Sequence, residues 1–194
     1  DGDGEMIAET IGMTTTVYIG GVYEKKDQGG TITQKKMYYA GSIRVAVSTK
    51  VGAGSWEVNF LLSDHLGSTS ITTNDSGDTV SEMRYSPWGS VRFSDGLSPT
   101  DFTYTGQLSS SYINLIRMGA RWYDPYLKRW TQPDSIIPEE GNPLDWDRYS
   151  YARNNPLRYT DPSGHYPEWL LDYLSFNGSN IANFYVPKGG KIGN

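Results

Sequence analysis

Apolar and β-branched residues in the first hundred positions occur in short runs separated by glycine-rich breaks. In the run 42–51, Ile43, Val45 and Val47 alternate with other residues and fall on one face of an extended chain. The breaks recur about every 8–12 residues, which is typical of antiparallel β structure. Further strand-like runs cover residues 14–23, 31–39, 56–60, 70–73 and 79–83.

The breaks between these runs have the composition of tight turns. Asn74–Asp78 is the strongest hairpin signal, because Asn, Asp and Gly tolerate a positive φ and the runs on either side would pair. Turns are also predicted at Lys26–Gly30, at Val51–Ser55 and at Pro87–Gly89, and a loop at Ser94–Pro99. The first half of the chain is therefore predicted to be a series of antiparallel hairpins.

From about residue 101 the runs become shorter, and arginines stand beside tyrosines and tryptophans, as in Arg121–Tyr123 and Arg129–Trp130. Neighbours in a strand point to opposite faces, so the ring that stacks on each arginine is expected to come from the next strand. The proline- and acid-rich segment 134–147 is predicted to be an irregular loop. Residues 167–176 are predicted to form a short C-terminal helix.

Composition and charge narrow the function classes. The chain has 15 Tyr, 6 Trp and 22 Gly, which favours strands joined by turns. The net charge of −5 argues against a nucleic-acid partner. The absence of cysteine excludes disulfides, thiolate metal sites and a thiol nucleophile. No apolar run reaches the roughly 18–20 residues that a membrane-spanning helix needs.

The two ends of the sequence suggest a piece of a longer chain or a processed product. The sequence opens on Asp1-Gly2-Asp3-Gly4 without a methionine or a signal peptide. The opening acidic stretch resembles a calcium loop, but Met6 stands where an EF-hand needs glycine. His65 and His165 are the chain's two histidines, too few and too far apart in sequence to suggest a metal site. We therefore expect no metal and no cofactor.

Seven short blocks, in order between about residues 37 and 165, resemble the RHS/YD-repeat family. Each block is weak by itself, but seven in the right order are specific. The blocks are Asp64–Ser68 (D-H-L-G-S), Arg84–Gly89 (Y-x-P-[FW]-G), Phe102–Gln107, Gly119–Pro125 (G-A-R-x-Y-D-P), Arg129–Asp134, Arg148–Leu157 and Asp161–Gly164.

This resemblance implies a mainly β fold in three parts. Hairpin strands over 1–100 would form shell wall, 101–165 would be the RHS-associated core that plugs the shell, and 166–194 would begin the variable C-terminal region. The implied function is structural enclosure in an exported surface or toxin-delivery protein. The implied partners are the rest of its own shell, a C-terminal cargo and other protein subunits, and the implied location is secreted or at the bacterial cell surface.

Some family members also have a core that is an aspartic self-protease, which makes Asp134 and Asp161 a candidate catalytic dyad. They lie 27 residues apart in sequence and would have to meet through the fold. Two such carboxyl groups can share a proton and activate water to cut near Gly164-His165, and Arg129 is a candidate to support their charge. The alternative is that each aspartate only caps a turn.

The sequence departs from the family pattern at three places. Lys128 stands where the family has glycine, Ser135-Ile136-Ile137 follows Asp134 in place of the usual P-x-G, and His165 replaces a leucine after the last glycine. An apolar pocket for leucine would disfavour an imidazole, so the cut is in doubt even if the dyad forms. A third hypothesis is an adhesion or carbohydrate-binding β module that uses exposed Trp and Tyr side chains on a concave face, with Trp56, Trp88 and Trp122 as the residues to test individually.

Overall fold

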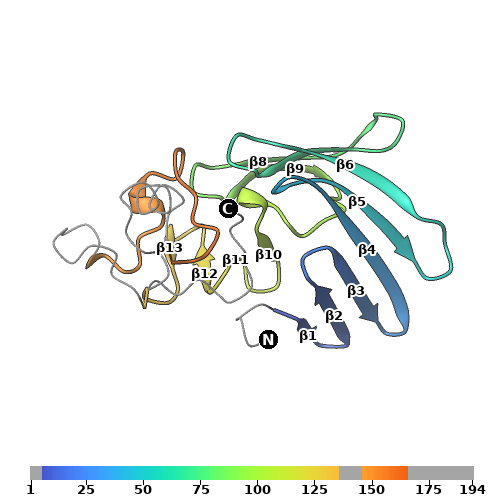
Figure 1. Cartoon of the computed structure of the whole chain (residues 1–194), viewed down its shortest axis with the longest axis horizontal. Helices are drawn as coiled ribbons and strands as arrows, with labels where there is room; N and C mark the ends of the chain where they lie inside the picture. The colour runs from blue at the N-terminus through green and yellow to red at the C-terminus, as the bar shows by residue number, and fades with distance from the viewer. Residues whose placement is uncertain (1–5, 136–145, 166–194) are drawn as a thin grey trace, which may run out of the picture.

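The computed structural model describes residues 6–135 and 146–165, which form two antiparallel sheets (Figure 1). The first, here called the wall sheet, has nine strands that pair in chain order, with β1 and β9 at its edges. Its strands are β1 (Ala8–Ile11), β2 (Thr14–Ile19), β3 (Tyr23–Gln28), β4 (Thr31–Ala40), β5 (Ile43–Val51), β6 (Glu57–Ser63), β7 (Thr69–Thr73), β8 (Thr79–Tyr85) and β9 (Val91–Gly96). The predicted antiparallel hairpin architecture is confirmed.

Three local predictions in the wall sheet are wrong. The segment predicted as a turn at Lys26–Gly30 is largely strand β3, and the reversal comes only at Gly29 and Gly30, where Asp27 Oδ1 accepts a hydrogen bond from the Gly30 backbone. Strand β1 was not predicted, and β9 extends into the predicted loop Ser94–Pro99. The polar sequence of β3 resembles a loop, but pairing with a neighbour on each side holds it extended.

One face of the wall sheet buries polar side chains where a sandwich would bury aliphatic ones. The register places Tyr18, Glu24, Lys35 and Thr49 opposite one another across β2 to β5. Glu24 is only 2% exposed and pairs with Lys35 at 3.4 Å. The wall sheet curves around β10 of the second sheet (Figure 1). Lys35 on the polar face pairs at 3.6 Å with Asp101, which lies between β9 and β10, so this face looks inward.

The buried carboxyl group of Glu24 makes a testable pH dependence. Burial raises the pKa of Glu24, and the attraction of Lys35 only partly opposes this. A pKa that is higher in the folded protein means that stability falls as the pH rises through the unfolded and then the folded value. We therefore expect Glu24→Gln to be more stable than the wild type at neutral pH, with the difference vanishing near pH 4.

Urea unfolding between pH 4 and pH 8 measures this difference, with Glu82→Gln as the matched control. Glu82 pairs with Arg84 and its side chain is 32% exposed, so its replacement should change stability little at any of these pH values. A Glu24→Gln protein that loses stability equally at pH 4 and pH 8 would show that burial of the charge is not the dominant cost.

The second sheet, here called the core sheet, carries the aromatic core. Its strands are β10 (Leu108–Ser110), β11 (Leu115–Met118), β12 (Arg121–Asp124) and β13 (Arg129–Trp130). Tyr123, Trp130 and Tyr151 pack with ring centroids 4.4–5.8 Å apart, and Tyr104 from the short 3-10 helix η1 (Tyr104–Gly106) joins them. Large rings with polar ends replace an aliphatic core here.

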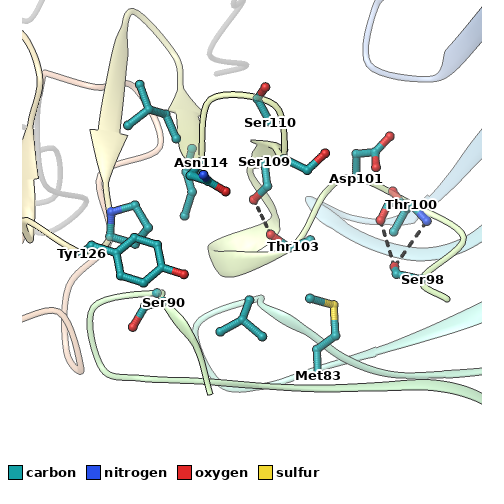
Figure 2. Close-up of a pocket in the computed structure, with 16 residues that line it drawn as sticks. Met83, Ser90, Ser98, Thr100, Asp101, Thr103, Ser109, Ser110, Asn114 and Tyr126 are labelled. Atoms are coloured by element: carbon teal, nitrogen blue, oxygen red, sulfur yellow. Dashed lines mark hydrogen bonds between the residues drawn. The ribbon is translucent and has the colours of Figure 1, made fainter. Parts of the chain in front are cut away.

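The wall and core sheets meet across a hydroxyl-rich seam (Figure 2). A cavity of about 280 Å³ lies between β8–β9 and β10–β11, and serines and threonines such as Ser90, Thr103 and Ser109 line it. Arg44 of the wall sheet contacts the core region across this seam. Its guanidinium stacks on Phe102 at 3.7 Å and donates to the carbonyl of Gly106 at 3.3 Å. The hydrophobic cluster of buried residues lies on the other side of this seam, in and around the core sheet.

Candidate functional site

The two aspartates predicted from the sequence meet at one guanidinium, that of Arg121. Arg121 Nη2 lies 2.7 Å from Asp134 Oδ2 and 3.5 Å from Asp161 Oδ2. Arg121 opens β12, Asp134 follows β13, and Asp161 begins the turn that ends at Gly164. We call these three residues the Arg121 cluster; all of them are buried.

The remaining contacts of Arg121 fix its guanidinium in place. Nη1 donates to the carbonyl of Arg148 at 3.1 Å, and Nε donates to the carbonyl of Gly164. The guanidinium also stacks on Trp130, with its central carbon 4.0 Å from the ring centroid. Trp130 belongs to the neighbouring strand β13, as the alternation of side chains along a strand predicts. Arg121 thus joins the two acids to the carbonyl of the candidate scissile bond.

The two carboxyl groups have different surroundings. Asp161 is 3% exposed, and burial raises its pKa, while the attraction of Arg121 acts in the opposite direction. Asp134 makes the shorter contact with Arg121. Burial thus favours the neutral form of Asp161, which is the form that a general acid requires.

Asp161 also does the turn-capping predicted as the alternative role. Its Oδ1 accepts from Ser163 Oγ at 3.1 Å and from the His165 backbone at 3.2 Å, while Oδ2 faces Arg121. The carboxylate of Asp161 thus caps a turn and faces the cluster at the same time. The capping role is therefore present, and the catalytic role of Asp161 stays a prediction.

Two glycines allow the turn 161–164 to dock on the core sheet. Gly119 and Gly164 both have positive φ values, +51° and +74°. A Cβ on Gly119 would overlap the backbone of Ser163, and one on Gly164 would overlap the carbonyl oxygen of Met118. The Ala120 amide donates to the Ser163 carbonyl at 3.0 Å. This close approach brings Asp161 and Gly164 to Arg121.

The candidate support residue Arg129 does not reach the two aspartates. Its guanidinium pairs with Asp147 at 3.0 Å, and its side chain is 54% exposed. Arg121, and not Arg129, is the cation that contacts both aspartates, although the sequence suggested only ring stacking for it. The alternation in β12 could have found it, because Arg121 shares a face with the buried Tyr123.

The two histidines lie in different places. His65 Nε2 lies 3.2 Å from the carbonyl oxygen of Leu157, whereas His165 Nδ1 lies 2.9 Å from Asp134 Oδ1, at the Arg121 cluster. Within residues 6–135 and 146–165, no group of three His, Cys, Asp or Glu side chains could hold a metal ion. In the same residues, no helix is long and apolar enough to span a membrane. The predicted helix at 167–176 and most of the predicted loop at 134–147 lie outside the described residues.

The three tryptophans of the carbohydrate hypothesis do not form one platform. Trp88 packs against the aromatic core, and its carbonyl accepts from Tyr123 Oη at 2.9 Å. Trp56 lies under the ammonium group of Lys36 at 4.3 Å, next to β6 of the wall sheet. Trp122 lines a separate cavity of about 120 Å³ beside Tyr112. The structure thus places the three tryptophans in different surroundings, and carbohydrate binding stays a prediction.

One departure from the family pattern has a backbone explanation. Lys128, where the family has glycine, has φ +62° in the turn between β12 and β13. The left-handed conformation that a glycine would adopt freely is thus kept by a lysine, at a cost of about 1–2 kcal/mol.

Comparisons with known proteins agree with this fold. A family model described as Teneurin YD-shell matches residues 55–157, more than half of the chain. Toxin subunit YenC2 of Yersinia entomophaga is 31% identical over 123 residues, 61% of this chain and 12% of YenC2. The tRNA nuclease WapA of Bacillus subtilis (strain 168) is 29% identical over 107 residues, 54% of this chain and 4% of WapA. Teneurin-1 of Gallus gallus is 26% identical over 135 residues, 66% of this chain and 5% of Teneurin-1. The chain thus spans a small part of the length of these relatives.

Solved structures show the same fold. The crystal structure of TcdB2-TccC3-TEV superposes with a TM-score of 0.70 at 19% identity, covering 84% of this chain and 8% of that one. The crystal structure of TcdB2-TccC3 without its hypervariable C-terminal region gives a TM-score of 0.67 at 20% identity, covering 78% and 8%. The family model matches more than half of the length of this chain. The chain therefore belongs to the Teneurin YD-shell family, among the RHS/YD-repeat proteins that the sequence motifs of the chain resemble.

Proposed function

We propose that this chain is the closing part of a hollow β shell. The wall sheet forms part of the wall of the shell, and the core region 101–165 closes the shell at one end. The observation that carries this proposal is the polar inner face of the wall sheet. Glu24, Lys35 and Thr49 lie on that face, and the seam residue Asp101 pairs with Lys35 at 3.6 Å. A face that buries charged and hydroxyl side chains under the start of the core region suits the inside of a shell closed by that region better than the centre of an apolar sandwich.

The relatives support enclosure of a cargo in an exported protein. YenC2 is named a toxin subunit, and one structural neighbour is described without a hypervariable C-terminal region. By analogy, the segment from 166 onward is the start of the cargo or leads to it, and the partners are the rest of the shell and other protein subunits. We propose the bacterial cell surface or the secreted fraction as the location.

Protection from proteolysis tests the enclosure. In the full-length natural protein, the segment after residue 165 should resist an added protease under conditions that degrade the same segment expressed alone. Arg44→Ala, which removes the contacts with Phe102 and Gly106 at the seam, should speed its degradation. The matched control is Arg84→Ala, because Arg84 is exposed and stacks on Phe93. Equal degradation of the enclosed and the isolated segment would refute the proposal.

A second candidate function is self-cleavage between Gly164 and His165 by the Arg121 cluster. The observation that favours it is the hydrogen bond from Arg121 Nε to the carbonyl of Gly164, because the same guanidinium binds both acids. This bond would polarise the carbonyl and stabilise the negative charge that develops on its oxygen.

The chemistry of this cut uses one water and no other reactant. The carboxylate of Asp134 takes a proton from water as the water oxygen bonds to the carbonyl carbon of Gly164. The protonated carboxyl group of Asp161 gives a proton to the departing nitrogen of His165 as the C–N bond breaks. The products are a carboxyl terminus at Gly164 and an amino terminus at His165.

We expect Asp161→Asn to abolish this cut, because an amide cannot supply the proton. Intact-mass measurement over days of incubation would detect the product ending at Gly164 in the parent protein and its absence in the variant. Asp147→Asn is the control, since Asp147 pairs with the surface residue Arg129 and should leave the rate unchanged. A product that forms equally in Asp161→Asn would exclude the proposed dyad.

A further inference from the structure

His165 occupies the side of Asp134 that faces away from Arg121. The two oxygens of Asp134 have different partners, with Oδ2 2.7 Å from Arg121 Nη2 and Oδ1 2.9 Å from His165 Nδ1. The imidazole is 27% exposed, so it lies at the rim of the buried cluster. Asp134 therefore has a close partner at each oxygen.

This arrangement conflicts with the role of Asp134 as a base. To accept a proton from water, the carboxylate must turn an oxygen toward that water. Oδ2 is held by a short charge-assisted contact with Arg121, so Oδ1 is the oxygen that would serve. Oδ1 is the atom that His165 contacts.

The hydrogen bond requires a proton on Nδ1 of the imidazole. A neutral ring with its proton on Nδ1 donates to the Asp134 carboxylate, and a protonated ring donates in the same way with a full charge. The backbone holds the ring in place as well, because the His165 amide donates to Asp161 Oδ1 at 3.2 Å and to Ser163 Oγ at 3.1 Å.

We propose that His165 is an inhibitory residue that keeps the Gly164–His165 bond intact by binding Asp134 Oδ1. This inference rests on the self-cleavage proposed above and adds its regulation. The residue on the leaving side of the bond restrains the base that would cut it. Displacing the imidazole removes its hydrogen bond to Oδ1, so that a water can donate to this oxygen and the cut can start.

Two substitutions at this position separate the hydrogen bond from the size of the side chain. His165→Leu removes every side-chain donor, and we expect cleavage at least about tenfold faster than in the wild type. His165→Asn keeps a donor near the position of Nδ1, so its rate should stay close to that of the wild type. His165→Leu combined with Asp161→Asn should remain intact. Intact mass over time gives all four rates, and near-ultraviolet circular dichroism of the aromatic core checks that each protein is folded.

The outcomes separate the inference from the function on which it rests. Wild-type protein that is cut as fast as His165→Leu overturns the inhibitory role and leaves the peptidase standing. His165→Asn that is cut as fast as His165→Leu also overturns it, because the donor would then not matter. If all four proteins are folded and intact, the peptidase itself is excluded, and the inhibition with it.

Discussion

Replacing Arg121 by methionine is expected to lower the free energy of unfolding by about 3–5 kcal/mol. The substitution leaves the carboxyl groups of Asp134 and Asp161 buried without their shared cation, and breaking a buried ion pair on one side costs far more than removing both partners. It also removes the donors to the carbonyls of Gly164 and Arg148.

Chemical denaturation of the purified chain measures this loss, and Arg129→Met is the matched control. Arg129 has the same charge and lies one strand away, but its pair with Asp147 is on the surface. Such a pair contributes at most about 1 kcal/mol. Arg121→Lys should also destabilise, because an ammonium cannot reproduce the planar fork or the stacking on Trp130. A loss in Arg121→Met no larger than that in Arg129→Met would show that the cluster does not stabilise the core.

Gly119→Ala is expected to destabilise the protein by about 2–5 kcal/mol, because two costs add. An alanine at φ +51° is strained by about 1–2 kcal/mol. Its Cβ would also fall within 3.0 Å of three backbone atoms of Ser163. Relieving that overlap requires the turn 161–164 to move away from the core sheet, and overpacking of this kind costs about 1–3 kcal/mol.

Gly12→Ala separates the two costs of the Gly119 substitution. Gly12 has a similar φ of +60°, but no atom lies within 4 Å of the position of its Cβ, so only the backbone strain applies. Thermal unfolding of the two variants compares them directly. We expect Gly119→Ala to lower the melting temperature clearly more than Gly12→Ala. Equal shifts would mean that the turn docks loosely and that Asp161 does not depend on Gly119 for its position.

The two predictions concern one structural unit. The turn that carries Asp161 and Gly164 docks through Gly119, and its carbonyl and carboxylate are held by Arg121. The contacts that dock this turn on the core sheet are therefore the contacts that would position a self-cleavage site. A substitution that loosens the docking of this turn should weaken both stability and any cut, so activity data on these variants need a stability measurement beside them.

The local pattern of the sequence was sufficient for the hairpins. Glycine- and asparagine-rich breaks determine where the chain reverses, and the alternation of side chains determines which face is buried. Both the turns and the buried face can therefore be predicted from windows of about ten residues. The wrong predictions occur where the composition of a segment favours one structure and its neighbours in the fold impose another. Strand β3 is polar enough to resemble a loop, and only its pairing with β2 and β4 holds it extended.

The candidate site needed the tertiary structure. The sequence indicated Asp134 and Asp161 through family motifs, yet nothing local could show that they share a cation, because 27 residues and several turns separate them. Arg129 and Arg121 look alike in sequence, each beside a tryptophan. Which of them is buried depends on which face of β12 or β13 turns toward the aromatic core, and that is set by packing between segments distant in the chain. The contact of His165 with Asp134 has the same origin, since docking of the turn through Gly119 decides where the imidazole lies.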